Sequence, residues 1–183
     1  MKYDLANLAR RSRNPRRNAI TIRPIVPPAT FATDLYSSSY LAIIGVWSGA
    51  VSRILASYER SLSEITSDAP DDMTAIIGLA EAEAAAVIIT VQARLRRWAE
   101  RIERWQRQKW QANVLSATGV DLSTLIGPED ARLTVGAAVQ RNVALVRSVS
   151  DQARGRISDA VFRGFQRRAS AADVSKDIRE AVA

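Results

Sequence analysis

Apolar residues recur every three or four positions along two long stretches of the chain, which is the spacing of one face of an α-helix. The first stripe runs from Tyr40 to Ile65, and the second runs from Met73 to Trp105. The segment 67–72, which contains Pro70, separates them, because proline and short polar residues interrupt helices. The pattern therefore predicts a long antiparallel helical hairpin over residues 34–113.

Polar residues at the ends of these stripes are of the kinds that helix termini favour. Thr33 or Asp34 can accept a hydrogen bond from the first backbone amides of the first helix. Asp71 and Asp72 suit the positive end of the second helix dipole. We therefore expect helices to begin near positions 34 and 71.

Residues 114–183 predict a small bundle of shorter helices. Gly119 is placed to end the long second helix in a left-handed conformation, and Gly127 with Pro128 marks a new helix start. Ser150 and Asp151 interrupt the next apolar pattern, and Ser170 can cap a last helix. No alternation typical of a strand occurs, so the predicted fold class is all-α.

The first 33 residues read as an extended basic arm. Four prolines lie between positions 15 and 28, and prolines prevent continued helix or sheet pairing. The N-terminus is basic and polar without the apolar core of a secretory signal. We expect this arm to order against a partner.

Charge is segregated along the chain. The net charge is +7, but residues 1–33 carry +6, residues 94–109 carry +5, and the remaining chain carries −4. Two concentrated basic patches on an otherwise mildly acidic chain indicate a partner of opposite sign.

Arginines of the arm are candidates for contact with nucleic acid, because guanidinium groups bind phosphate without needing a rigid scaffold. An acidic protein surface would attract the same residues, and both readings stay open. The five candidates are Arg10, Arg11, Arg13, Arg16 and Arg17.

The second basic patch interleaves arginines with tryptophans. Arg94, Arg97, Arg101 and Arg104 are candidates for contact with phosphate or with a protein partner. Tryptophans among arginines could stack on bases, but heptad spacing favours helix packing. We therefore assign five residues to packing against a partner helix: Trp47, Val51, Tyr58, Trp98 and Trp105.

The composition argues against an enzyme. The chain has no histidine and no cysteine, which excludes Ser-His-Asp and Cys-His catalysis and imidazole or thiolate metal sites. Its carboxylates show no metal-binding spacing, and no glycine-rich phosphate loop occurs. We expect no cofactor and no metal. The longest apolar run, residues 41–51, is too short to span a bilayer, so we expect no membrane association.

Residues 110–183 resemble the N-terminal part of the phage head morphogenesis family, the Mu protein F-like minor head proteins. The similarity lies in Trp110, in the turn Thr118-Gly119-Val120-Asp121-Leu122, and in the helix Arg141-Asn142-Val143-Ala144-Leu145-Val146-Arg147-Ser148-Val149. An amphipathic helix ending near a glycine follows, and then a short helix such as 171–182. Within this motif, Gly119 and Asp121 would shape a turn and Asn142 would hydrogen-bond a loop backbone.

The resemblance implies a structural protein of a tailed phage in the capsid interior, near the portal. Its partners would be the portal protein or inner capsid surface, packaged double-stranded DNA bound without sequence preference, and other copies of itself. Family members usually continue with a further region beyond the point where this sequence stops. The competing hypothesis is a free-standing, regulatory nucleic-acid-binding protein, and an enzyme fragment is the third.

Overall fold

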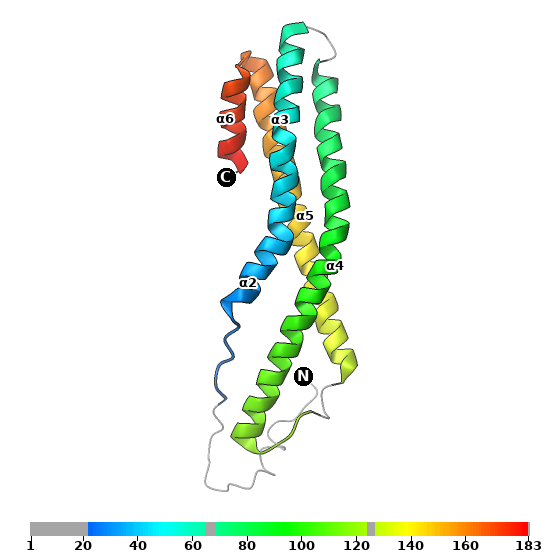
Figure 1. Ribbon diagram of the computed structural model, residues 1–183, viewed down its shortest axis with the longest axis vertical. Coiled ribbons are helices and arrows are strands. Elements are labelled where there is room, and N and C mark those ends of the chain that lie inside the picture. The colour runs from blue at the N-terminus through cyan, green and yellow to red at the C-terminus, as the bar shows by residue number, and fades with distance from the viewer. Residues whose placement is uncertain (1–21, 65–68, 124–126, 183) are drawn as a thin grey trace.

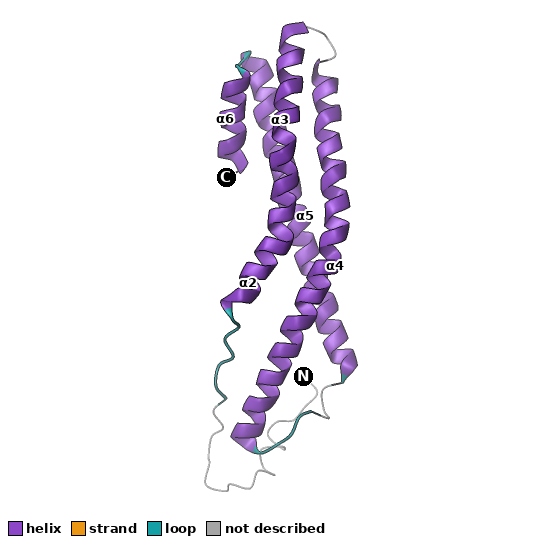
Figure 2. Cartoon of the chain, in the orientation of Figure 1, coloured by secondary structure: helices purple, strands orange, loops and turns teal. Residues whose placement is uncertain are grey.

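The computed structural model describes residues 22–64, 69–123 and 127–182 of the chain (Figure 1). Within these ranges every regular element is helical and no strand is found, which confirms the all-α class (Figure 2). In chain order the elements are α2 (Ala29–Leu35), the π-helical turn η1 (Tyr36–Tyr40), α3 (Leu41–Glu64), α4 (Ala69–Thr118), α5 (Pro128–Arg167) and α6 (Ala171–Val182).

The helices α3 and α4 run antiparallel along one another, as the two apolar stripes predicted (Figure 1). The first helical stretch begins at Ala29, directly after Pro28, and not at Asp34. The expected capping role of Thr33 or Asp34 was therefore wrong, and Thr33 instead donates its hydroxyl proton to the carbonyl of Ala29 within the helix. The part of the predicted arm from residue 29 onward is helical.

A bend separates α2 from α3 at η1 (Figure 1). Three consecutive serines lie in this turn, and the hydroxyls of Ser37 and Ser38 both donate to the carbonyl oxygen of Asp34. Serine hydroxyls that bond a preceding carbonyl loosen the helical ladder, and π-turns are common sites of bending. The bend carries α2 toward the second half of α4.

The helix α5 runs without interruption from Pro128 to Arg167, so the predicted break at Ser150 and Asp151 was wrong. Ser150 is buried, and its hydroxyl accepts a hydrogen bond from the indole nitrogen of Trp47 at 3.0 Å. A serine hydroxyl that is hydrogen-bonded to another helix does not bond the backbone groups of its own helix, so the helix continues through this position.

Three other helix ends lie where the sequence predicted them. Gly119 has φ of 73° and ends α4, a conformation that residues with a side chain adopt rarely. Pro128 opens α5 at its first position. Ser170 accepts a hydrogen bond from the backbone amide of Asp173 and caps α6.

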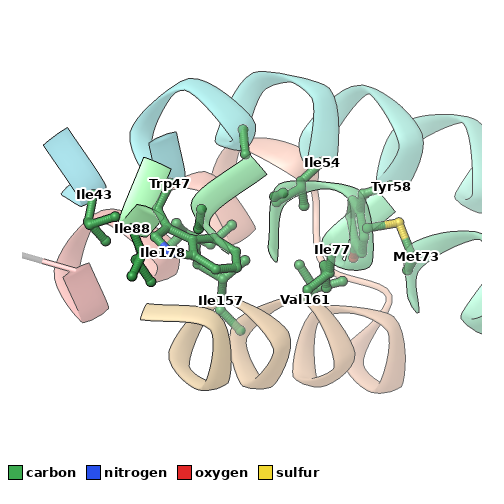
Figure 3. Packing of buried hydrophobic residues seen from close by; sticks show 14 of the residues in the cluster. Ile43, Trp47, Ile54, Tyr58, Met73, Ile77, Ile88, Ile157, Val161 and Ile178 are labelled. Atoms are coloured by element: carbon green, nitrogen blue, oxygen red, sulfur yellow. The ribbon is translucent and has the colours of Figure 1, made fainter. Parts of the chain in front are cut away.

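The main core lies where α3, α4, α5 and α6 pack together (Figure 3). Trp47 and Tyr58 of α3, Leu95 of α4, Ile157 of α5 and Ile178 of α6 are all at most 1% exposed. Each large apolar side chain buried in this way contributes about 1.5–3 kcal/mol relative to exposure.

Beyond this core, α4 and α5 diverge (Figure 1). A small second cluster of Ala99 from α4 with Val135 and Val139 from α5 marks the last place where they bury side chains against each other. Between Glu100 and Asn113 no side chain of α4 is fully buried. The arginine-rich half of α4 therefore extends away from the four-helix core.

Candidate nucleic-acid interface

The arginines at positions 94, 97, 101 and 104 project from one side of α4, since their spacings of three, four and three match the helical repeat. All four are exposed. This side of α4 faces α2 and η1, the helical segments that follow the N-terminal arm. The structure thus brings the second basic patch next to the point where the described part of the arm ends.

Two of these arginines already contact the neighbouring segment. Arg101 forms an ion pair with Asp34 at 2.9 Å, and Arg94 donates to the carbonyl oxygen of Ser38 at 3.4 Å. Arg97 lines the same open hollow of about 320 Å³ beside Asp34. Within the described ranges no ion pair is found for Arg97 or Arg104, so these guanidinium groups can bind an external anion.

The other sides of this half of α4 are also basic. Arg96, Arg107 and Lys109 add positive charge, and only Arg107 has a partner on the same helix, Glu103 at 3.1 Å. Because α4 lies apart from α5 here, a long anion such as a nucleic-acid backbone can approach it from more than one side.

The two tryptophans between the arginines contact α2. The indole nitrogen of Trp98 donates to the carbonyl oxygen of Phe31 at 2.8 Å, and the ring of Trp105 meets the Phe31 ring edge-on with centroids 5.8 Å apart. Both indoles are half-buried. They hold α2 against α4 and thereby fix the surroundings of Arg94 and Arg101.

The tryptophan and tyrosine of α3 pack in the core of the chain itself. Trp47 and Tyr58 are fully buried, and Tyr58 donates to the carbonyl oxygen of Ala169 at 2.8 Å and packs on Phe165. Val51 is half-buried against the same core. The helices that this stripe packs against are α4, α5 and α6 of the same chain.

The residues that carry the phage-family resemblance lie at the far end of α4 and in α5. The carboxylate of Asp121 accepts a hydrogen bond from the backbone amide of Ser123, and this bond lowers the pKa of Asp121. Trp110 is half-buried. Asn142 donates to the carbonyl of Ala138 in its own helix at 2.8 Å, so the expected bond to a loop was wrong. Ala138 lies one helical turn before Asn142, so its carbonyl is within reach of the Asn142 side chain.

The arm candidates Arg10, Arg11, Arg13, Arg16 and Arg17 lie outside the described residues. Among the residues that the structure does describe, no group of three carboxylates could hold a metal ion. The described hollows are open grooves, including one of about 440 Å³ between α4 and α5 and one of about 540 Å³ between α3, α5 and α6.

Ion pairs between helices are the feature that sequence reasoning missed. Glu83 of α4 binds Arg53 of α3 through two hydrogen bonds of 2.7 and 2.6 Å, and Glu81 binds Arg154 of α5 at 2.6 Å. The hydrogen bonds from Arg53 lower the pKa of Glu83. The sequence does contain a signal for these ion pairs, because Glu81 and Glu83 are the only charged residues between Thr74 and Val91.

Comparisons with known protein families, with curated proteins and with solved structures give no match. The resemblance of residues 110–183 to phage head proteins therefore remains a prediction.

Two helical stretches, Ala29–Ser63 and Asp71–Thr118, are long and apolar enough to cross a membrane by length and composition alone. Mean hydropathy reaches 1.4 and 1.8 in their most apolar windows, of which 28% and 22% is buried in the structure. The uninterrupted run 41–51 considered from the sequence had missed them. Beside the second stretch, Arg147 and Asp151 of α5 are exposed and line the groove between α4 and α5.

Proposed function

We propose that this chain is a structural, non-enzymatic protein of a tailed phage head, docked at the portal or inner capsid surface and binding packaged double-stranded DNA without sequence preference. The arginine-rich half of α4 is the observation that carries this proposal. Six of its seven basic side chains between Arg94 and Lys109 are exposed along a single helix that leaves the core. In the described residues no group of three carboxylates that could hold a metal ion accompanies them.

The shape of this basic surface suits a polyanion better than a small ligand. From Arg94 to Lys109 the helix rises about 22 Å, which spans several phosphates of a duplex. The neighbouring hollow is open and only about 320 Å³ in volume. Exposed arginines on a convex helix contact phosphates without reading base edges.

The resemblance of residues 110–183 supplies the phage context. The resemblance rests on sequence, including the turn at Gly119 and Asp121 after α4 and the short last helix α6. A capsid-interior protein meets concentrated DNA, which agrees with two separate basic segments.

DNA binding can be tested by fluorescence anisotropy with two duplexes of unrelated sequence over a range of salt concentrations. We expect equal affinity for both duplexes and a steep loss of affinity with salt. The variant Arg94→Gln/Arg104→Gln should reduce the slope of log affinity against log salt by about two units, one for each phosphate contact removed.

The matched control Arg60→Gln/Arg163→Gln removes the same charge from exposed positions on α3 and α5. Its slope should equal that of the wild type. An equal change in both variants would mean that only net charge matters. A strong preference for one duplex would favour the regulatory alternative.

Docking can be tested by pull-down with the purified portal protein encoded by the same phage genome, using the full chain and a form lacking residues 1–33. Loss of binding on deletion would assign docking to the arm. Retained binding would assign it to the helices and leave the arm for DNA. Absence of binding in both forms would contradict portal docking.

A further inference from the structure

The outer face of α4 carries a second apolar stripe that nothing in the described chain covers. The stripe lies on the side of α4 opposite the core, and the first half of α4 forms one edge of the bundle (Figure 1). Leu79 is 61% exposed and Ile89 is 73% exposed. The six members of this stripe, all exposed, are Ala75, Leu79, Ala82, Ala86, Ile89 and Ala93.

The spacing of the stripe is that of a coiled coil. Successive members are separated by four, three, four, three and four residues, which is the heptad seam of a helix that packs along another helix. The alanines allow close approach of two backbones, at about the 8 Å end of the usual interaxial range. No charged residue lies on the seam itself.

The seam is also symmetric about position 84. Ala82 and Ala86 lie two residues on either side of it, Leu79 and Ile89 lie five, and Ala75 and Ala93 lie nine. In an antiparallel pair of identical helices centred at this position, each large residue meets a large one and each alanine meets an alanine. This is the self-complementarity that a two-fold interface requires.

The charges beyond the two ends of the seam follow the same symmetry. Asp71 and Asp72 precede it, Arg96 and Arg97 follow it, and all four are exposed. In the antiparallel arrangement, Asp72 of one copy lies level with Arg97 of the other, and Asp71 lies level with Arg96, each to within one residue. A parallel arrangement would place aspartate beside aspartate and arginine beside arginine.

We propose that two copies of this chain associate through the outer faces of their α4 helices in an antiparallel, two-fold symmetric dimer. Glu81 and Glu83, near the centre, are each paired within their own chain and do not oppose the contact. The dimer would place the arginine-rich segments of the two copies at opposite ends, with their centres roughly 50 Å apart. The proposal does not depend on the phage function.

The assembly can be tested by analytical ultracentrifugation of the full chain. We expect a species of twice the 20.1 kDa chain mass. Because Ile89 is exposed, Ile89→Glu should leave the helical circular dichroism unchanged and raise the dimer dissociation constant by roughly 100-fold or more. Leu133→Glu, at an exposed position on α5, is the matched control and should remain dimeric.

Charge exchange tests the register. Asp72→Arg and Arg97→Glu should each weaken the dimer, and the double variant should recover it, because each interchain pair is restored with its signs reversed. Recovery is a result that damage to the fold would not produce. Failure of the double variant to recover would contradict this register.

Cysteine crosslinking tests the direction, since the chain has no cysteine of its own. A mixture of Ala75→Cys and Ala93→Cys chains should form a disulfide-linked dimer on oxidation, whereas neither variant should do so alone. Crosslinking of Ala75→Cys alone would indicate a parallel pair. A monomer at all concentrations would overturn the proposal, and vesicle binding by that monomer, lost in Ile89→Glu, would assign the face to lipid.

Discussion

Gly164 of α5 lies against side chains of both α3 and α6. A β-carbon at this position would lie 2.5 Å from the Cγ2 atom of Val174 and 3.0 Å from the hydroxyl oxygen of Tyr58. Neither neighbour can retreat easily, because Tyr58 is fixed by its hydrogen bond to the carbonyl of Ala169 and both side chains are buried. The glycine is therefore a packing requirement of the core.

We expect Gly164→Ala to lower the free energy of unfolding by about 1–3 kcal/mol, since overpacking a filled core displaces its neighbours. Urea unfolding at one fixed protein concentration measures this change. The control Gly155→Ala adds the same methyl group to the same helix where nothing lies within 4 Å. It should raise the free energy of unfolding by about 0.5–1 kcal/mol, and a destabilised Gly155→Ala would contradict the packing explanation.

The sequence predicted which residues are buried better than it predicted which residues contact one another. The spacing of Trp47 and Tyr58 placed both on an apolar stripe, and both are buried. The hydrogen bond between Trp47 and Ser150 joins residues 103 positions apart, and periodicity contains no information about such pairs. For the same reason Ser150 was taken as a helix break when it is an acceptor in the core.

At the scale of elements, the ion pair between Arg53 and Glu83 links the two helices of the hairpin. Arg53 is the only arginine between Leu41 and Tyr58 on α3. Its partner, Glu83, is one of the two glutamates in the apolar half of α4. Two hydrogen bonds from the guanidinium group lower the pKa of Glu83, and Glu83 in turn raises the pKa of Arg53. The pair joins α3 to α4 at the surface, beside the buried core that the two helices share.

This pair predicts a defined pH response. A carboxylate with a lowered pKa in the folded state stabilises the fold above its unfolded pKa of about 4.5, and this stabilisation is lost as the pH falls through the folded pKa. The urea midpoint of the wild type should therefore fall more between about pH 6 and about pH 3 than that of Glu83→Gln.

The variant Arg53→Gln should show the same reduced response as Glu83→Gln, because it removes the group that shifts Glu83. Equal responses in the wild type and both variants would mean that the pair does not affect stability in solution. Both substituted side chains are about half exposed, so the helices should form in each variant.

Element boundaries followed local chemistry where glycine, proline or a capping serine marked them, as at Gly119, Pro128 and Ser170. The predicted boundaries were wrong where contacts between distant segments determine where a helix begins or continues. The predicted helix start at Asp34 missed α2, which is held by Trp98 and Trp105 from a segment about 70 residues away. The outer apolar stripe of α4 was missed because the inner stripe alone was sufficient to predict an amphipathic helix.

At the scale of the whole molecule, the chain divides into a four-helix core and a long basic helix that leaves it (Figure 1). The hairpin and the location of the second basic patch could be inferred from the sequence. The divergence of α4 and α5 could not, because it depends on where the two helices stop burying each other, at Ala99, Val135 and Val139. Beyond these residues no side chain of α4 is fully buried until Val114.

The same division predicts a gradient of local stability along α4. From Met73 to Ala99 a side chain is fully buried at every third or fourth position, whereas none is fully buried from Glu100 to Asn113. Backbone hydrogen bonds open more readily where few apolar contacts hold a helix in place. Hydrogen exchange should therefore show protection factors at least about tenfold lower at residues 103–110 than at residues 84–95.

Phe31→Ala should lower protection in the 103–110 segment further and leave the 84–95 segment unchanged. The reason is that the Phe31 ring packs edge-on against Trp105, and its removal weakens the contact between α2 and the basic half of α4. The backbone carbonyl that accepts from Trp98 is kept in this variant. Uniform protection along α4 would mean that the basic half is as firmly held as the core. Saturating DNA should raise protection at residues 94–110 and leave residues 73–88 unchanged if that half of α4 is the surface that binds it.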